Sequence, residues 1–172
     1  MENNNLLSLN LLKEYKIFLE SFSEEEFVLT PPSKGWSYSE VFTHIIAAND
    51  LAILSIYKCA RPNSEPIKKT DWRVKLILFI GSLPPGKYKV PSILADKAIK
   101  SSKEVVSKNL DLMMERINGL SDKMKNANKG SKAKHPRLGY LNAFQWSRFI
   151  FIHTKHHLKQ LKRIQMELKF NS

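Results

Sequence analysis

Cysteine is nearly absent from this sequence, since Cys59 is the only one among 172 residues. A lone cysteine cannot form a disulfide within the chain, and it excludes zinc sites built from several cysteines. Any metal site must therefore be built from histidine, aspartate or glutamate side chains.

Long hydrophobic runs are also missing. The longest, such as Leu76–Ile80, are far shorter than the roughly 20 residues that cross a bilayer. The first residues, MENNNLLSLN, lack a basic region followed by a continuous apolar stretch, so no secretory signal is expected. With 42% hydrophobic residues the chain can bury one core. We therefore expect a soluble single domain over residues 1–172, a cytoplasmic location and no insertion into a membrane.

Strand patterns are missing as well, because no segment of four to eight residues alternates cleanly between apolar and polar. Helical spacing dominates, and it predicts helices over about 6–22, 37–60, 101–120 and 142–168, with a shorter one over 71–80. Three of the starts carry capping signals, which are Ser37 with Glu40, Ser101 with Glu104, and Asn142 with Gln145. Four long helices predict an all-α four-helix bundle, with a long connection over 61–91 between the second and third. The segment around His135 is predicted to be a polar, mobile loop.

Positive charge is in excess, with 28 Lys and Arg against 16 Asp and Glu, a net charge of +12. Such a surface attracts polyanions. Much of the charge lies in two loop-like stretches, 68–75 and 123–137, and no aromatic residue is interleaved with the second. Specific nucleic-acid binding is therefore not expected, although weak binding through the basic surface is an alternative function.

Two histidines lie on the apolar face of the last predicted helix. His153 and His157 are four residues apart, and helical spacing places them on one stripe with Trp146, Ile150, Gln160 and Ile164. Burying two imidazoles is costly unless their nitrogens find partners, and a shared divalent ion supplies one for both. His156 points to one side of this stripe and is interpreted either as a residue that supports a ligand or as a rim residue, not as a ligand itself. Gln160 is either a hydrogen-bond partner of a metal ligand or an ordinary buried amide.

A third ligand is available in the second predicted helix. His44 shares its face with apolar and small residues, namely Val41, Ala48, Leu51, Ala52 and Ser55. The small ones leave room for a close helix approach or for a ligand cavity. A lone histidine on an apolar face is more often a core residue than a ligand, so spacing alone leaves both interpretations open. If a metal is shared, the nitrogens of the three rings should converge to within about 3 to 4 Å.

Three further residues near these helices are interpreted as structural. Cys59 follows His44 by 15 residues, which is about 22 Å along a straight helix and too far for it to act beside that histidine. Trp36 and Trp146 adjoin a helix start and an apolar stripe respectively, which favours packing over a role in binding substrate.

Three segments together resemble the DinB/YfiT-like superfamily. They are GWSYSEVFTHI at 35–45, PGKYKVP at 85–91, and HPRLG at 135–139 followed by Trp146, His153 and His157. The resemblance implies a four-helix bundle in up-down-down-up order that holds a divalent metal, zinc or nickel, with three histidines. On this sequence those ligands are His44, His153 and His157.

The resemblance also bears on function. Some members of the superfamily are transferases or isomerases that use mycothiol, bacillithiol or glutathione, and many of its members form dimers. We therefore expect a metal-dependent enzyme of the thiol S-transferase or hydrolase type, with a low-molecular-weight thiol or an electrophilic molecule as partner, in a homodimer. A non-catalytic binding or stress-response module is the alternative, because the resemblance defines a site more securely than a reaction.

Overall fold

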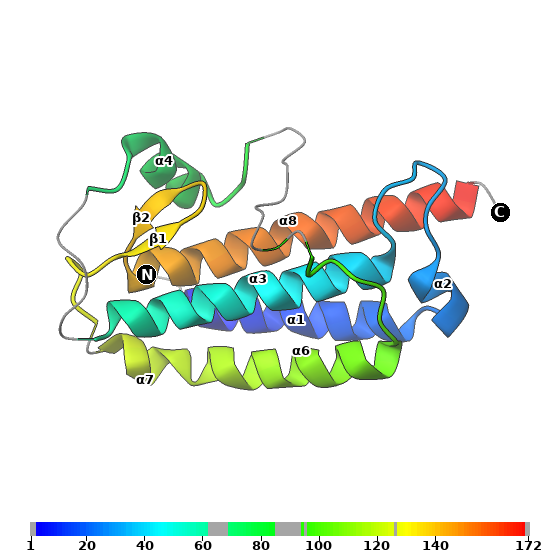
Figure 1. Cartoon of the computed structure of the whole chain (residues 1–172), viewed down its shortest axis with the longest axis horizontal. Helices are drawn as coiled ribbons and strands as arrows, with labels where there is room; N and C mark the ends of the chain where they lie inside the picture. The colour runs from blue at the N-terminus through cyan, green and yellow to red at the C-terminus, as the bar shows by residue number, and fades with distance from the viewer. Residues whose placement is uncertain (1–2, 62–68, 85–93, 95, 126, 171–172) are drawn as a thin grey trace.

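The computed structural model of the chain describes residues 3–61, 69–84, 94, 96–125 and 127–170. Most of them are helical, and four long helices lie side by side along the molecule (Figure 1). These are α1 (Asn4–Glu20), α3 (Tyr38–Cys59), α6 (Lys103–Asn118) and α8 (Ala143–Phe170). α1 and α3 each contact both α6 and α8, which closes a ring of four helices around one apolar core. The all-α prediction is confirmed at this level.

Two of the three predicted helix starts have the hydrogen bonds that their sequences indicate. Before α3, the Ser37 hydroxyl accepts from the backbone N–H of Glu40 at 3.3 Å, and the Glu40 carboxylate accepts from the N–H of Ser37 at 2.9 Å. Before α8, Asn142 and Gln145 exchange the equivalent bonds at 2.9 and 3.0 Å. Both pairs satisfy N–H groups that the first helical turn leaves without partners.

The third predicted start is wrong by one residue. The hydroxyl that caps α6 belongs to Ser102, which accepts from the N–H of Val105 at 3.4 Å. Ser101 is unsuited to this role because its backbone is engaged elsewhere. Its N–H donates to the Ser39 hydroxyl at 2.7 Å, and its carbonyl accepts from the same hydroxyl at 2.8 Å. A contact with α3 therefore displaces the start predicted from local sequence.

Some boundaries also differ from those predicted. The acidic stretch after α1 forms its own short helix, α2 (Glu24–Val28), which has a capping box between Ser23 and Glu26. Acidic side chains in a first helical turn complement the helix dipole. α6 ends at Asn118, and α7 (Leu120–Lys125) follows it directly.

A small hairpin corrects the prediction that the chain has no strands. β1 (Ala133–His135) and β2 (Gly139–Leu141) pair antiparallel, with Ala133 opposite Leu141 and His135 opposite Gly139. Strands of three residues are too short to show an alternating pattern, so periodicity could not reveal them. The turn ends at Gly139, whose φ of 71° lies in the left-handed region that glycine adopts readily.

The long connection is described only in part. Its described portion contains α4 (Trp72–Ile80), which is capped by Asp71 and ends at Gly81 in the left-handed conformation. The Arg148 side chain ties α4 to α8, because its Nε donates to the carbonyl of Leu78 at 2.9 Å. Residues 62–68 and 85–93 lie outside the described residues, and the segment resembling the superfamily at 85–91 lies among them.

α3 is the most apolar long helix, and by length and composition alone it could cross a membrane. In the fold it packs against α6 and α8 on two sides. Side chains along its length, including Phe42, Ile45, Ala52 and Ile56, are completely buried within the protein. Its apolar composition is therefore explained by its place in the core, as is common for a central helix.

Candidate metal centre

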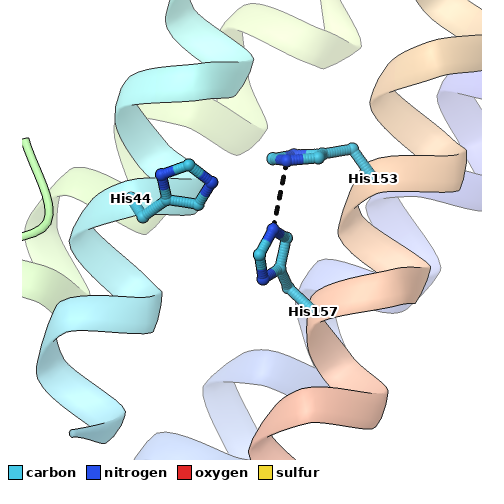
Figure 2. A group of neighbouring side chains, drawn as sticks. All are labelled: His44, His153 and His157. Atoms are coloured by element: carbon cyan, nitrogen blue, oxygen red, sulfur yellow. Dashed lines mark hydrogen bonds between the residues drawn. The ribbon is translucent and has the colours of Figure 1, made fainter. Parts of the chain in front are cut away.

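Three histidines meet between the two helices that face each other across the core. His44 extends from α3, and His153 and His157 extend from α8 toward it (Figure 2). One nitrogen from each ring lies within 4.8 Å of the others. The Nε2 atoms of His153 and His157 are 3.1 Å apart. The set is therefore wider than the 3 to 4 Å predicted, although one pair falls within that range.

The local sequence explains why the two histidines of α8 face inward. Trp146, Ile150 and Ile164 lie on the same stripe and are all buried, so packing of this stripe fixes the rotation of the helix. His153 and His157 occupy the middle of the stripe and are each only 8% exposed. On α3, the buried Ala48 lies one turn beyond His44, where a small side chain suits close contact with α8.

Burial keeps all three imidazoles neutral at pH 7. It lowers the pKa of His44 to about 4. Burial, aided by the neighbouring His44 and His156, lowers the pKa of His157 to about 3. The pKa of His153 is well below its usual value because burial and then the proximity of His157 and His44 disfavour its charged form. Neutral imidazole is the form that binds metal ions.

Gln160 orients the His157 ring. Its Oε1 atom lies 2.7 Å from Nδ1 of His157, and an amide oxygen can only accept, so Nδ1 carries the proton. In neutral imidazole the other nitrogen, Nε2, then presents a lone pair, and it faces His153. Of the two interpretations of Gln160, the structure supports a partner of His157, because the amide fixes which nitrogen is available for a metal.

The donor set fits a divalent ion. In a tetrahedral zinc site, N–Zn bonds of about 2.0 to 2.1 Å separate the nitrogens by about 3.3 Å, close to the distance between His153 and His157. The separations that involve His44 are at most 4.8 Å, so the widest would have to shorten by no more than about 1.5 Å. Within the part of the chain that the structure describes, the Nδ1 atoms of His44 and His153 are buried and have no hydrogen-bond partner. Leaving such polar atoms buried is costly, and metal–nitrogen bonds at the same rings would offset that cost.

Comparison with known proteins identifies the family of the chain. Residues 11–161, which contain all three histidines, match the model of the DinB superfamily. The chain belongs to the DinB superfamily. It is also similar to the uncharacterized protein YuaE of Bacillus subtilis (strain 168), with 26% identity over 88% of this chain and 90% of that protein. No solved structure matches the chain.

Aromatic rings line the DinB site on both sides. The Trp36 ring lies 4.9 Å from the His44 ring, between centroids, and the half-buried indole covers it. The Phe149 ring stacks on His153 at 5.2 Å with an interplanar angle of 23°. Trp146 is part of the core, as predicted for a packing residue. Trp36 packs too, but against a candidate ligand rather than only against the core.

His156 lies at the edge of the cluster, as its position outside the stripe indicates. Its ring meets that of His157 edge to face at 5.0 Å, and it is only half-buried. It is not among the residues that could share an ion. Partial burial and the nearby charges of Arg163 and Lys159 lower its pKa.

His135 is the residue near this DinB site that sequence reasoning missed. The sequence predicts a polar, mobile loop at this position, but His135 lies in β1 with only 9% exposure. Its Nδ1 accepts from the backbone N–H groups of Arg137 and Leu138 at 3.1 and 3.0 Å. Its ring meets Phe149 edge to face at 4.6 Å, so it supports the ring that stacks on His153. The sequence shows the dipeptide His135-Pro136, but no pattern in it indicates that His135 packs against α8.

Cys59 takes no part in the site. It is 1% exposed, its thiol lies 3.6 Å from the carbonyl of Leu141, and burial raises its pKa. A buried thiol with a raised pKa is a poor nucleophile. The structural interpretation of Cys59 agrees with these observations.

Proposed function

We propose that this chain is a divalent-metal-binding DinB protein in which His44, His153 and His157 hold a zinc or nickel ion. The observation that carries the proposal is the convergence of three buried, neutral imidazoles from facing helices within 4.8 Å. The superfamily's up-down-down-up helix order is part of the proposal. It is supported by the course of the chain in Figure 1, where α1 and α8 run one way and α3 and α6 run the other.

We propose further that the protein is a metal-dependent enzyme of the thiol S-transferase or hydrolase type. Three protein ligands leave a coordination position open, where a bound ion lowers the pKa of water or of a thiol. The roles of the protein residues follow from their contacts. Gln160 fixes the proton of His157 on Nδ1, and Trp36 and Phe149 shield the His44 and His153 rings from water. Low-dielectric surroundings strengthen the attraction between a cation and an anionic ligand.

The expected partner is a low-molecular-weight thiol or an electrophilic small molecule. The net charge of +12 supports an anionic partner, since long-range attraction raises its local concentration. A cytoplasmic location, a single domain and a homodimer belong to the same proposal. A non-catalytic binding module is the competing function, and the metal site alone does not distinguish the two.

The first experiment measures whether the site binds metal. Protein purified without a metal-affinity tag would be analysed for its elements and melted with and without chelator. A ligand present at about 100 times its Kd stabilises by about 2.7 kcal/mol, which for a chain of this size corresponds to about 5 to 10 °C. We expect chelation to lower Tm accordingly in the natural protein and to have no effect in His44→Ala. Absence of metal, together with a Tm insensitive to added zinc and nickel, would refute the proposal.

The second experiment separates enzyme from binding module. The metal-loaded protein would be incubated with bacillithiol, mycothiol or glutathione and a panel of electrophilic acceptors, and thiol consumption would be followed. Turnover that His153→Ala abolishes supports the enzyme. The non-catalytic binding module would be favoured if the fully metal-loaded protein turned over no combination of thiol and electrophile and hydrolysed no ester or amide substrate.

A further inference from the structure

α4 presents an exposed apolar stripe on the outside of the molecule. Trp72, Leu76, Phe79 and Ile80 are all exposed, Phe79 to 84% and Trp72 to 66%. At about 100° per residue, these four side chains fall within an arc of about 100° on one side of the helix. Val74 and Leu78 lie on the other side and are buried. Figure 1 shows α4 outside the ring of long helices. Because Val74 and Leu78 are its buried residues, the stripe on the opposite side faces away from the core.

Cationic side chains border this stripe on both edges. Helical spacing places Arg73 just beyond Ile80 on one edge and Lys75 beyond Phe79 on the other, and both are exposed. The Arg73 guanidinium lies 5.3 Å from the Trp72 ring. Asp71 is the only acidic residue among 69–84, and its carboxylate is engaged at the helix start by the N–H of Arg73.

Lys132, which directly precedes β1, adds positive charge near the same helix. Partial burial and then the charge of Lys75 lower the pKa of Lys132. The segment before α4 is fixed to the hairpin, because the Thr70 hydroxyl donates to the carbonyl of Tyr140 at 2.8 Å. An anionic partner would stabilise a surface that carries several like charges.

We propose that the α4 stripe docks the protein on the anionic surface of a lipid bilayer. Trp72 and Phe79 would enter the boundary between headgroups and acyl chains, while Arg73 and Lys75 would contact anionic headgroups. An apolar face with flanking cations and aromatic residues is the composition of helices that lie in this boundary. A second copy of the chain fits less well, because pairing two such faces would bring the same cations together. The proposal is independent of the metal site, and it requires no helix that spans the membrane.

Sedimentation with vesicles tests the proposal on the full chain. Vesicles of phosphatidylcholine alone would be compared with vesicles of phosphatidylcholine mixed with phosphatidylserine. We expect binding to the anionic vesicles only, with a blue shift of tryptophan fluorescence, and weakening as salt rises from about 50 to 200 mM. Phe79→Ser should weaken binding about tenfold and Lys75→Gln about fivefold. Both side chains are exposed, so neither change should affect the fold or the metal content.

Ile17→Ser is the matched control, because it removes an apolar side chain that is 69% exposed on α1. It should bind vesicles like the natural protein. Equal binding to both kinds of vesicle, or undiminished binding by Phe79→Ser, would overturn the proposal. Size-exclusion chromatography adds a further decisive outcome. A dimer that Phe79→Ser dissociates, without vesicle binding by the natural protein, would assign the stripe to a second copy instead.

Discussion

The Oε1 atom of Gln160 lies 2.7 Å from the Nδ1 atom of His157, about one turn further along α8. This contact settles the tautomer of His157, because the amide oxygen requires a proton on Nδ1. The lone pair of Nε2 is thereby directed at the space shared with His153 and His44.

Gln160→Leu should therefore weaken metal binding without removing a ligand. Loss of such an orienting partner typically costs about 10- to 100-fold in affinity. The Kd for zinc would be measured by competition with a chromogenic chelator. Gln165→Leu, a change of the same kind on the same helix, should leave the Kd unchanged. An unaltered Kd in Gln160→Leu would show that the amide has no role in metal binding.

His156 and His157 are adjacent, but only His157 faces the shared space. We expect His157→Ala to lose bound metal and His156→Ala to retain it, as measured by elemental analysis of the purified variants. His156 is half-buried at the edge of the cluster, so its removal leaves the three facing rings in place. Equal loss of metal from both variants would contradict the assignment of ligands.

Stability of the metal-free protein should fall as the pH is lowered below about 6.5. Burial lowers the pKa of His44 to about 4 and that of His157 to about 3. The usual pKa of histidine is about 6.5. At pH values between the lowered pKa and about 6.5, these histidines bind protons in the unfolded chain but not in the folded protein, so acid favours unfolding. Each such imidazole contributes up to about 1.4 kcal/mol per pH unit.

Urea unfolding of chelator-treated protein between about pH 7.5 and pH 5 would measure this slope. Burial and the charge of Arg137 also lower the pKa of His135 to about 4. His135→Gln should therefore make the free energy of unfolding less dependent on pH, by the contribution of one imidazole. A free energy of unfolding that does not change over this range would show that the rings are protonated in the folded state.

His135 should matter more for stability than its place in a hairpin suggests. His135→Ala leaves the N–H groups of Arg137 and Leu138 without their acceptor and removes the ring beside Phe149. We expect a loss of about 1 to 3 kcal/mol in the free energy of unfolding, measured with urea at neutral pH. His156→Ala should cost less. Equal and small losses in the two variants would indicate that the hairpin contributes little to the fold.

DNA binding should be weak and independent of sequence. The net charge of +12 gives nonspecific attraction, and such contacts are lost steeply between about 50 and 200 mM salt. Titration of labelled DNA across that range would measure the salt dependence. Tight binding that persists at the upper end and distinguishes one sequence from another would make nucleic acid the main partner.

The sequence by itself determined the four long helices, and it determined that His153 and His157 share one helix face. Capping pairs such as Ser37 with Glu40 act within one helical turn, so the information for them is local. The stripe that contains His153 and His157 likewise follows from helical geometry alone, because packing buries the apolar face of an amphipathic helix. His44 is a candidate ligand from the apolar face of its own helix, and the superfamily resemblance groups it with His153 and His157, since no spacing rule connects it to α8.

The tertiary structure decided what depends on contacts between distant segments. Ser39 on α3 engages Ser101 and thereby moves the start of α6 to Ser102. His135 is buried because the hairpin packs beside α8, although its neighbours Lys134 and Pro136 are exposed. α4 is apolar nearly all round, and only packing determined which side is buried and which is exposed. Local pattern fixes the period of a helix, but the partner that covers each face is set by the rest of the fold.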